Sequence, residues 1–318
     1  MVDNLHMPVT PETQKLIDAR AASGLPEVWQ APVAVIRKNN HAGIAGTGTP
    51  EPIFRIDHRF IPGPTADLPI RIYRPSDEPN LPALVFIHGG GWVIGTMDGS
   101  EQLIRSLANK GNFIVVAVGY QKAPEHAFPI PFDDCYATTT WVFENAADLG
   151  INPTQIGVGG VSAGANLASA VALKARDTSE CELAFQMLVV PCNNADLNYP
   201  SATENESGFM LSKQAMTWFW SQYLQNPQDR ENSYAVPTQA KTFSGLAPAI
   251  VITAQYDPLR DDGFEYSQLL ANAGVETIYR EFPGMVHGFI SLAASIPQAF
   301  ECQQFLADQI NAILDRQK

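Results

Sequence analysis

The sequence predicts an α/β protein, with a mixed, mainly parallel sheet of about eight strands and helices on its faces. Continuous apolar runs such as residues 113–118 suit strands that are buried on both faces of a parallel sheet, and helical patterns fall between these runs. Two earlier segments, 53–60 and 68–73, alternate apolar and polar residues, as half-exposed antiparallel strands do. Antiparallel strands that lead into an alternating β/α series indicate a sheet of this mixed kind.

The individual elements follow from the same patterns. Strands are expected at residues 53–60, 68–73, 83–87, 113–118, 156–161, 184–190, 249–254 and 276–282. Helices are expected at residues 102–109, 134–145, 163–175, 263–272 and 297–314. Another helix should begin near Thr10, because its hydroxyl can cap a helix and Pro11 fits the first helical position. Glycine-rich residues 43–48 predict a mobile loop, since a phosphate loop would need a strand before it and Lys-Ser/Thr after it.

Two segments do not belong to the sheet by pattern, residues 1–50 and residues 192–245. The chain of 318 residues is long enough for one large domain with or without a small appendage. Residues 192–245 exceed an ordinary connection, which marks an insertion, and they include a helix of their own. One face of that helix is apolar at helical spacing and consists of Met216, Phe219, Trp220 and Tyr223. We expect this face to pack against the protein body, while Phe209, Met210 or Trp218 is presented to a ligand from a cap over a pocket.

Charge and composition exclude several classes of protein. A net charge of −13 argues against a nucleic-acid partner and favours neutral over anionic substrates. Residues 1–6 lack the features of a secretion signal, and no apolar run reaches the roughly 20 residues that span a bilayer. The cysteines show no metal-ligand spacing and are typical of free thiols in a reducing compartment: Cys135, Cys181, Cys192 and Cys302. A soluble, cytoplasmic protein without a metal site is therefore expected.

The motif Gly160-Val161-Ser162-Ala163-Gly164 is the most informative stretch of the chain. It follows a short apolar segment and opens the helical pattern at 163–175. In this strand–turn–helix context the flanking glycines permit a turn sharp enough to hold a serine hydroxyl above the sheet, the nucleophile elbow G-x-S-x-G. An ordinary glycine-rich turn can have the same five residues, so the interpretation depends on partner residues elsewhere.

A nucleophilic serine of this kind needs a base and an acid, which follow it along the chain with the histidine last. His287 is the one histidine of six that follows Ser162, and it lies just past the last expected strand. Asp257 is the preferred acid because it follows the strand at 249–254, at the sheet edge where α/β sites assemble. Its position also suits a helix cap, and Asp261 and Asp262 stay as alternatives one turn later.

A glycine-rich segment, His88-Gly89-Gly90-Gly91-Trp92, follows the strand at 83–87. Glycines let backbone N–H groups approach a substrate oxygen with no Cβ in the way, as an oxyanion hole requires. Nucleotide binding is the alternative for such segments. However, neither 89–95 nor 157–164 satisfies G-x-G-x-x-G, and no Walker pattern is present.

In combination, these motifs resemble those of the hormone-sensitive-lipase-like esterases (the bacterial family IV type) of the α/β-hydrolase superfamily. The resemblance covers about residues 68–318 and includes segments 88–92, 120–129, 160–164, 257–261 and 287–289. It implies an α/β-hydrolase fold with an N-terminal cap segment at 1–50, a catalytic domain at 51–191 and 246–318, and a cap insertion at 192–245. It also implies a serine carboxylesterase that acts on short- to medium-chain esters through an acyl-enzyme and needs no cofactor.

The resemblance assigns roles by position. Ser162 is the expected nucleophile, His287 the general base and then acid, and Asp257 the group that orients His287. The expected oxyanion donors are the backbone N–H groups of Gly89, Gly90, Gly91 and Ala163.

Four other positions bear on this comparison. His88 and Glu125 match the family pattern and are interpreted as structural residues that tether loops under the site. Val161 and Ala165 depart from it, because the family usually has Asp or Thr, and Gly, at these places. The departures leave the subfamily and the substrate preference open, but they do not affect the triad.

The alternatives to an esterase are amide hydrolysis on the same triad and a non-catalytic ligand-binding member of the fold. Nothing in the sequence separates esters from amides, whereas the complete triad disfavours a protein that only binds. A homodimer through an edge strand near the C-terminus is a further hypothesis.

Overall fold

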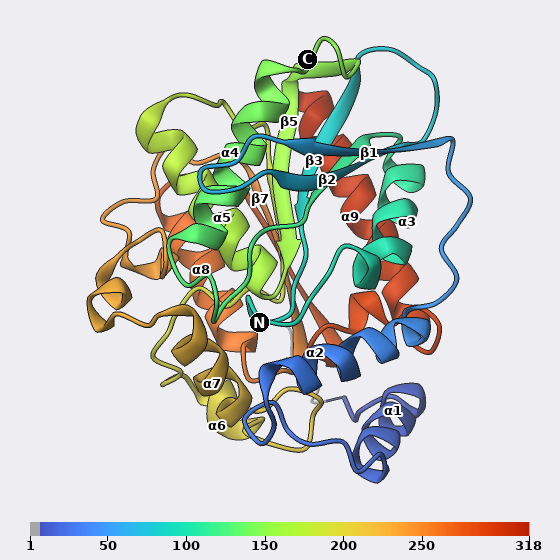
Figure 1. The fold of residues 1–318 in the computed structure, drawn as a ribbon, viewed down its shortest axis with the longest axis vertical. Coiled ribbons are helices and arrows are strands. Elements are labelled where there is room, and N and C mark those ends of the chain that lie inside the picture. Colours follow the sequence, from blue (N-terminus) through green and yellow to red (C-terminus); the bar gives the residue numbers. More distant parts are fainter. Residues whose placement is uncertain (1–6, 318) are drawn as a thin grey trace.

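The computed structural model describes residues 7–317, which form an eight-stranded sheet flanked by helices (Figure 1). The strands are β1 (Arg55–Ile61), β2 (Leu68–Arg74), β3 (Leu81–Ile87), β4 (Ile114–Val118), β5 (Ile151–Val161), β6 (Gln186–Val189), β7 (Ala249–Tyr256) and β8 (Thr277–Val286). Their order in space is β1-β2-β4-β3-β5-β6-β7-β8. Both pairings of β2 are antiparallel and all the others are parallel, so the predicted mixed sheet is confirmed.

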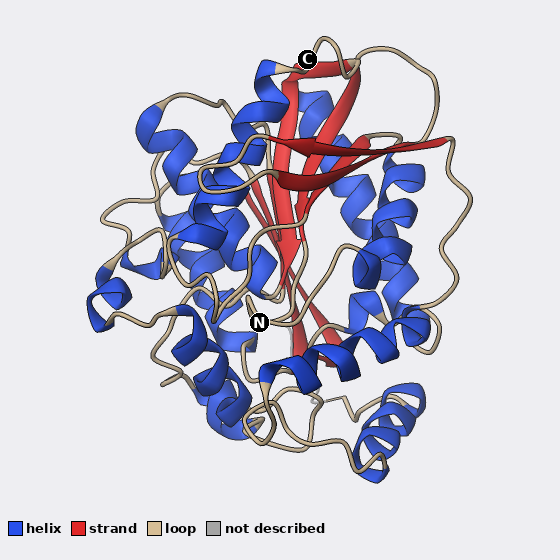
Figure 2. Cartoon of the chain, viewed as in Figure 1, coloured by secondary structure: helices blue, strands red, loops and turns tan. Residues whose placement is uncertain are grey.

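Helices cover both faces of the sheet (Figure 2). They are α1 (Pro11–Ala22), α2 (Val33–Ala42), α3 (Glu101–Gly111), α4 (Ile130–Glu144), α5 (Ala163–Thr178), α6 (Pro200–Glu204), α7 (Lys213–Tyr223), α8 (Arg260–Asn272) and α9 (Pro297–Arg316). Helices α3 and α9 contact each other on one face, and α4, α5 and α8 lie on the other. The sheet therefore separates two hydrophobic cores, one on each face.

The central strands are apolar because both of their faces are covered. All five residues of β4 and all eight of β7 are buried, as the continuous apolar runs predict. Burial of each large aliphatic side chain contributes roughly 1.5–3 kcal/mol to folding. This rigid middle of the sheet fixes the positions of the loops that follow β3, β5, β7 and β8.

The N-terminal region differs from the sequence-based expectation. The helix that begins after Thr10 is present, and the Thr10 side chain accepts a hydrogen bond from the Thr13 N–H at 3.3 Å. Helix α2 was not predicted, and the expected loop at 43–48 contains a 3₁₀ helix, Gly43–Thr47. Tertiary contacts stabilise α2, since Ile36 is buried and Arg37 donates hydrogen bonds to the Val93 and Ala123 carbonyls.

Helices α1, α2, α6 and α7 lie at one end of the sheet, at the bottom of Figure 1. The four apolar residues predicted to pack from α7 onto the body are all buried. Trp92 fixes this contact, because its ring lies 4.4 Å from that of Trp220 and 4.5 Å from that of Tyr223, measured between centroids. Residues 1–6 of the expected N-terminal cap segment lie outside the described residues. Between residues 7 and 317, no helix combines the length and apolar character needed to cross a membrane.

Candidate active site

Ser162 is the single residue between the end of β5 and the start of α5. Its backbone angles, φ 58° and ψ −121°, are rare for a residue with a side chain and mark a strained turn. The turn needs glycine on both sides. A Cβ on Gly160 would lie 2.5 Å from the Ile87 carbonyl oxygen, and one on Gly164 would lie 2.0 Å from the same atom. The motif therefore adopts the elbow geometry that the sequence predicts.

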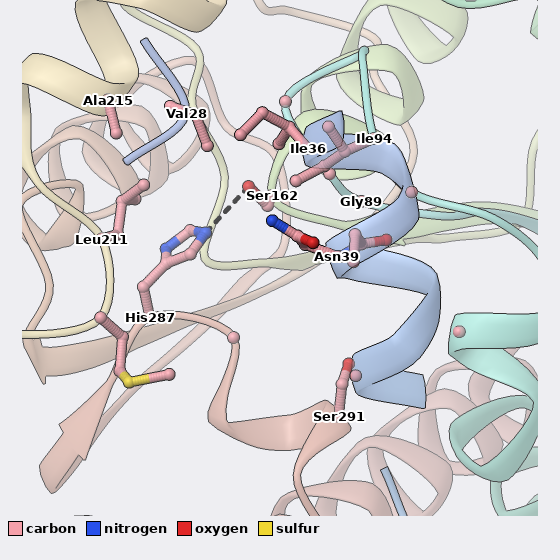
Figure 3. Close-up of a pocket in the computed structure, with 18 of the residues that line it drawn as sticks. Val28, Ile36, Asn39, Gly89, Ile94, Ser162, Leu211, Ala215, His287 and Ser291 are labelled. Carbon is pink, nitrogen blue, oxygen red and sulfur yellow. Dashed lines mark hydrogen bonds between the residues drawn. The ribbon is translucent and has the colours of Figure 1, made fainter. Parts of the chain in front are cut away.

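The structure brings Ser162, His287 and Asp257 together from three loops at the carboxyl ends of β5, β8 and β7. His287 Nε2 lies 2.9 Å from Ser162 Oγ, the contact drawn as a dashed line in Figure 3. His287 Nδ1 lies 2.7 Å from Asp257 Oδ2. Asp257 is fully buried, whereas 8% of Ser162 is exposed. The serine is thus accessible to a small molecule, and the acid is not.

Asp257 is fixed by its surroundings in a way that defines the imidazole tautomer. Its Oδ1 accepts the Leu259 N–H at 2.9 Å, and α8 begins only at Arg260, so Asp257 is not the cap of that helix. Its Oδ2 is left to accept the Nδ1–H of His287. His287 Nε2 is then the acceptor for the Ser162 hydroxyl, and this arrangement can withdraw the serine proton.

The glycine-rich loop after β3 borders the same cavity as Ser162 and His287. Gly90 and Gly91 have φ of +111° and +57°, and a Cβ on Gly91 would lie 2.1 Å from the Phe219 ring. The Gly90 carbonyl accepts the N–H groups of Val93 and Ile94, at 3.0 and 2.9 Å. Among residues 7–317, no backbone acceptor is found for the Gly90 and Gly91 N–H groups, which suits donors reserved for a ligand.

Ala163 is the fourth predicted oxyanion residue and the first residue of α5. The first N–H groups of a helix have no acceptor within the helix, so the Ala163 N–H is free of the helical ladder. The positive end of the α5 dipole lies at the same place and favours a developing negative charge. The position of Ala163 next to Ser162 therefore fits the expected role.

His88 lies beneath the glycine loop and does not contact Ser162. Its ring stacks on Tyr120 at 4.4 Å between centroids, and its Nδ1 lies 2.9 Å from the Gly89 carbonyl oxygen. The Tyr120 hydroxyl donates to the His88 carbonyl at 3.1 Å. Burial lowers the pKa of the His88 imidazole to about 4. A neutral histidine with these contacts supports the loop, in line with the structural interpretation.

The pKa of His88 predicts a stability that depends on pH. The imidazole has a pKa of about 6.5 in the unfolded chain and about 4 in the folded protein. Between these two pH values the unfolded state binds a proton that the folded state does not bind, so protonation favours unfolding. The free energy of unfolding should therefore fall by up to about 3 kcal/mol between pH 7 and pH 4. Urea unfolding of the wild type and of His88→Asn at both pH values measures this. Parallel losses in the two proteins would contradict the assignment to His88.

Glu125 connects the segment between β4 and α4 to α2. Arg37 Nη1 and Nη2 each lie 2.7 Å from a Glu125 carboxylate oxygen, and this guanidinium lowers the pKa of Glu125 to about 2. Arg37 also donates to the backbone carbonyls of Val93 and Ala123, both at 2.9 Å. The residue interpreted as a tether therefore holds the N-terminal helix, above the site, rather than a loop beneath it.

The two alternative acids do not reach His287. Asp261 Oδ2 accepts the Ser201 N–H at 2.8 Å, at the start of α6. Asp262 is fully buried, and its Oδ2 accepts the N–H groups of Asn193 and Asn194 at 2.8 and 3.1 Å. Both acids therefore fix the 192–245 segment to α8.

A cavity of about 530 Å³ opens above Ser162. Of the three residues expected to face a ligand, only Met210 lines it. Phe209 instead packs on Tyr256 at 4.9 Å between ring centroids, and Trp218 packs on Phe219 at 5.2 Å. Sequence reasoning missed most of the other lining residues from the N-terminal and 192–245 segments, among them Val28, Ile36, Asn39, Leu211, Ala215, Met216 and Phe219.

No group of three or more His, Cys, Asp or Glu side chains within residues 7–317 is placed to hold a metal ion. The four cysteines are free and buried, and burial raises the pKa of the Cys135 and Cys192 thiols well above the usual range. These thiols are therefore poor nucleophiles, because the reactive form is the thiolate.

The fold, the strained serine and the histidine–carboxylate pair are together typical of serine hydrolases of the α/β type. Comparison with known proteins leads to the same class. Residues 84–291 match the family model described as alpha/beta hydrolase fold. The chain is 41% identical over 256 residues to the carboxylesterase NlhH of Mycobacterium tuberculosis, covering 79% of this chain and 80% of the relative.

Solved structures agree. A hyperthermophilic esterase from Pyrobaculum calidifontis superposes with a TM-score of 0.91 at 35% identity, over 97% of this chain and 99% of the other. An ester hydrolase from the metagenome of Lake Arreo, in complex with a bipyridine phosphonate derivative, gives a TM-score of 0.93 at 36% identity, over 96% and 99%. The chain belongs to the hormone-sensitive-lipase-like esterases of the α/β-hydrolase superfamily. It is a carboxylic ester hydrolase, as the sequence motifs predict.

Proposed function

We propose that Ser162, His287 and Asp257 are the catalytic triad of this carboxylesterase. The distances from His287 to the serine hydroxyl and to the buried carboxylate, 2.9 and 2.7 Å, carry the proposal. His287 removes the proton as Ser162 Oγ attacks the ester carbonyl, and the imidazolium is stabilised by Asp257. His287 then protonates the departing alkoxide, which leaves an acyl-enzyme.

The N–H groups of Gly89, Gly90, Gly91 and Ala163 supply the donors for the oxyanion in both steps. Water replaces the alcohol, gives a proton to His287 and attacks the acyl carbonyl. The bond from the acyl carbon to Ser162 Oγ then breaks, and His287 returns the proton to that oxygen, so that the acid is released and Ser162 is restored. The fixed backbone donors act where negative charge develops, without reorganisation during the reaction. The complex of the related Lake Arreo enzyme with a phosphonate derivative supports this reading, because phosphonates resemble the tetrahedral intermediate.

The substrate class follows from the cavity, which supports esters of short to medium acyl chains. Its volume of about 530 Å³ suits such a ligand, and apolar side chains from residues 7–50 and 192–245 cover it. We therefore assign both segments to a cap over the catalytic domain at 51–191 and 246–318. Phe219 and Met216 of α7 pack on the body and still reach the cavity, so packing and capping are combined in one helix.

A p-nitrophenyl ester series from acetyl to dodecanoyl tests the proposed substrate class. The value of kcat/KM should peak among short to medium chains and fall beyond them, because the enclosed volume is limited. Labelling with an aryl phosphonate, followed by peptide mass spectrometry, should place the adduct on Ser162. Folded protein without turnover of any ester would contradict the substrate class, and amide substrates would then be tested. An adduct on another residue would contradict the triad.

We also propose a cytoplasmic location and a homodimer that pairs through β8. The location rests on four free, buried thiols, which suit a reducing compartment. The dimer rests on the position of β8 at the edge of the sheet, flanked by the exposed apolar side chains of Phe264, Leu269 and Phe300. Sedimentation over a hundredfold range of concentration measures the assembly. A monomer throughout would contradict the dimer.

A further inference from the structure

Helix α2 contributes two polar side chains, Asn39 and Asn40, to the lining of the cavity above Ser162. Ile36 and Asn39 are three positions apart, which places them on the same face of the helix, and both line the cavity with Ser162. Figure 3 shows the Asn39 amide extending from α2 into the cavity on the side of Ser162. A substrate bound to Ser162 would therefore meet an amide from the N-terminal segment.

The hydrogen-bonding capacity of Asn39 is unused within the protein. Among residues 7–317, its side-chain amide has no hydrogen-bond partner, although the residue is half-buried. The apolar side chains of Ile36, Ile94 and Val28 line the same cavity (Figure 3). A ligand that fills the cavity excludes water from this amide, and an unpaired amide in such a place disfavours binding. A ligand with a matching polar atom avoids that penalty.

The amide is also held in a defined place relative to Ser162. Arg37, two residues before Asn39, binds the Val93 and Ala123 carbonyls and both oxygens of Glu125. These acceptors belong to the loop that follows the oxyanion glycines and to the segment packed beside it. These hydrogen bonds hold α2 in a fixed position relative to the oxyanion loop. The Asn39 amide on α2 is therefore held in place before a ligand binds, and such a donor discriminates between ligands better than a mobile one.

The walls of the cavity differ in polarity. Met210, Met216 and Phe219 of the 192–245 segment give one apolar side. Asn39, Thr96 and Ser291 contribute polar groups elsewhere in the lining. The Thr96 hydroxyl already accepts the Gly99 N–H at 3.2 Å, so an ester with alkyl groups on both sides of the carbonyl would leave Asn39 and Ser291 without partners.

We propose that Asn39 is a specificity-determining residue that donates a hydrogen bond to an acceptor oxygen of the substrate near the scissile carbonyl. The favoured substrate class is esters that have an ether, hydroxyl or second carbonyl oxygen within about two or three atoms of the reacting group. This inference rests on the proposed esterase function and adds the chemistry of the substrate to it. The acceptor oxygen belongs either to the acyl part or to the alcohol part of the ester, and the experiment tests each part separately.

Two pairs of esters with matched shape supply the test. Ethyl methoxyacetate and ethyl butyrate differ in one ether oxygen on the acyl side, and 2-methoxyethyl acetate and butyl acetate differ in one on the alcohol side. For each pair the measured quantity is the ratio of kcat/KM for the ether to kcat/KM for the alkyl ester. Comparing this ratio between wild type and Asn39→Leu cancels the intrinsic reactivity of the substrates.

The ratio should fall about three- to tenfold in Asn39→Leu for the pair whose oxygen reaches the amide, as expected for one neutral hydrogen bond. Asn39→Asp, which offers an acceptor in place of the donor, should lower the same ratio at least as far. His41→Leu is the matched control, because His41 is an exposed polar residue of the same helix that does not line the cavity. It should leave both ratios unchanged.

The outcomes separate this inference from the function on which it rests. Ratios within twofold of wild type for both pairs, in both Asn39 variants, would overturn the role of Asn39 while ester turnover continued. A folded wild type that hydrolyses none of the four esters would instead contradict the proposed function. Circular dichroism and thermal unfolding of each variant show whether a changed ratio comes from a folded enzyme.

Discussion

Ser162→Ala is expected to lower kcat for ester hydrolysis by at least about 10⁴-fold, because it removes the atom that forms the acyl-enzyme. The oxyanion donors and the cavity stay in place, so a small residual rate above the uncatalysed reaction is expected. Hydrolysis of p-nitrophenyl butyrate at several enzyme concentrations measures the loss. A burst of nitrophenol, equal to one per active site in the wild type, should be absent from the variant.

The fold should survive this substitution. The change removes one oxygen atom, whose contact is with His287, and leaves the backbone hydrogen bond from the Ser162 N–H to Val189 in place. Ser169→Ala is the matched control. It removes a buried serine hydroxyl within α5, which donates to the Ala165 carbonyl at 3.0 Å, accepts from Asn193 Nδ2 at 3.0 Å and does not line the cavity. Turnover by Ser162→Ala at more than about 1% of wild type would reject Ser162 as the nucleophile.

The sequence predicted the sheet and the proximity of Ser162, Asp257 and His287 because local chemistry specifies both. A continuous apolar run such as 113–118 is stable as a strand that is covered on both faces, and β4 is such a strand. The elbow is equally local, since Gly160 and Gly164 permit an approach to the Ile87 carbonyl that no side chain would allow. Asp257 and His287 follow strands whose ends meet at one edge of the sheet, so their position along the chain was enough to pair them.

Helix α2, in the segment proposed as part of a cap, could not be derived in this way, because its structure depends on contacts with distant residues. Val33, Val35 and Asn39 lower the intrinsic helix propensity of α2, so its sequence carries only a weak local signal for a helix. The helix forms because Ile36 is buried and Arg37 binds the Val93 and Ala123 carbonyls and the Glu125 carboxylate. No local sequence pattern predicts that Arg37 pairs with Glu125, which lies 88 residues away along the chain.

The sequence was also insufficient to predict which side chains of the 192–245 segment face the cavity. An apolar face at helical spacing predicts burial, and Met216 and Phe219 are buried. The pattern does not say that the same two side chains reach the cavity, because that depends on where the glycine loop lies beneath them. A Cβ on Gly91 would lie 2.1 Å from the Phe219 ring, so helix and loop are fitted to each other across the site. Such complementarity between distant segments is a property of the tertiary structure.

Asp257→Asn should lower kcat/KM for esters by about 10³–10⁴-fold while changing the shape of the site very little. The carboxylate accepts the Nδ1–H of His287 at 2.7 Å, whereas an asparagine amide can turn its N–H₂ group toward the ring. The imidazole would then carry its proton on Nε2, facing Ser162, and would be unable to accept the serine proton. Stabilisation of the imidazolium would be lost as well. Steady-state kinetics on p-nitrophenyl butyrate measures the combined loss.

Asp261→Asn provides the control for this prediction, because Asp261 lies four residues further along the chain and binds Ser201 and Arg260 instead of His287. Its activity should stay within a few-fold of wild type, and any cost should appear in the thermal unfolding of the 192–245 segment. If Asp261→Asn lost as much activity as Asp257→Asn, the loss would reflect disturbance of the loop after β7 and not the tautomer of His287. Both variants remove one negative charge from the same part of the chain. A large loss of activity in Asp257→Asn alone would therefore show that catalysis depends on the buried Asp257 carboxylate.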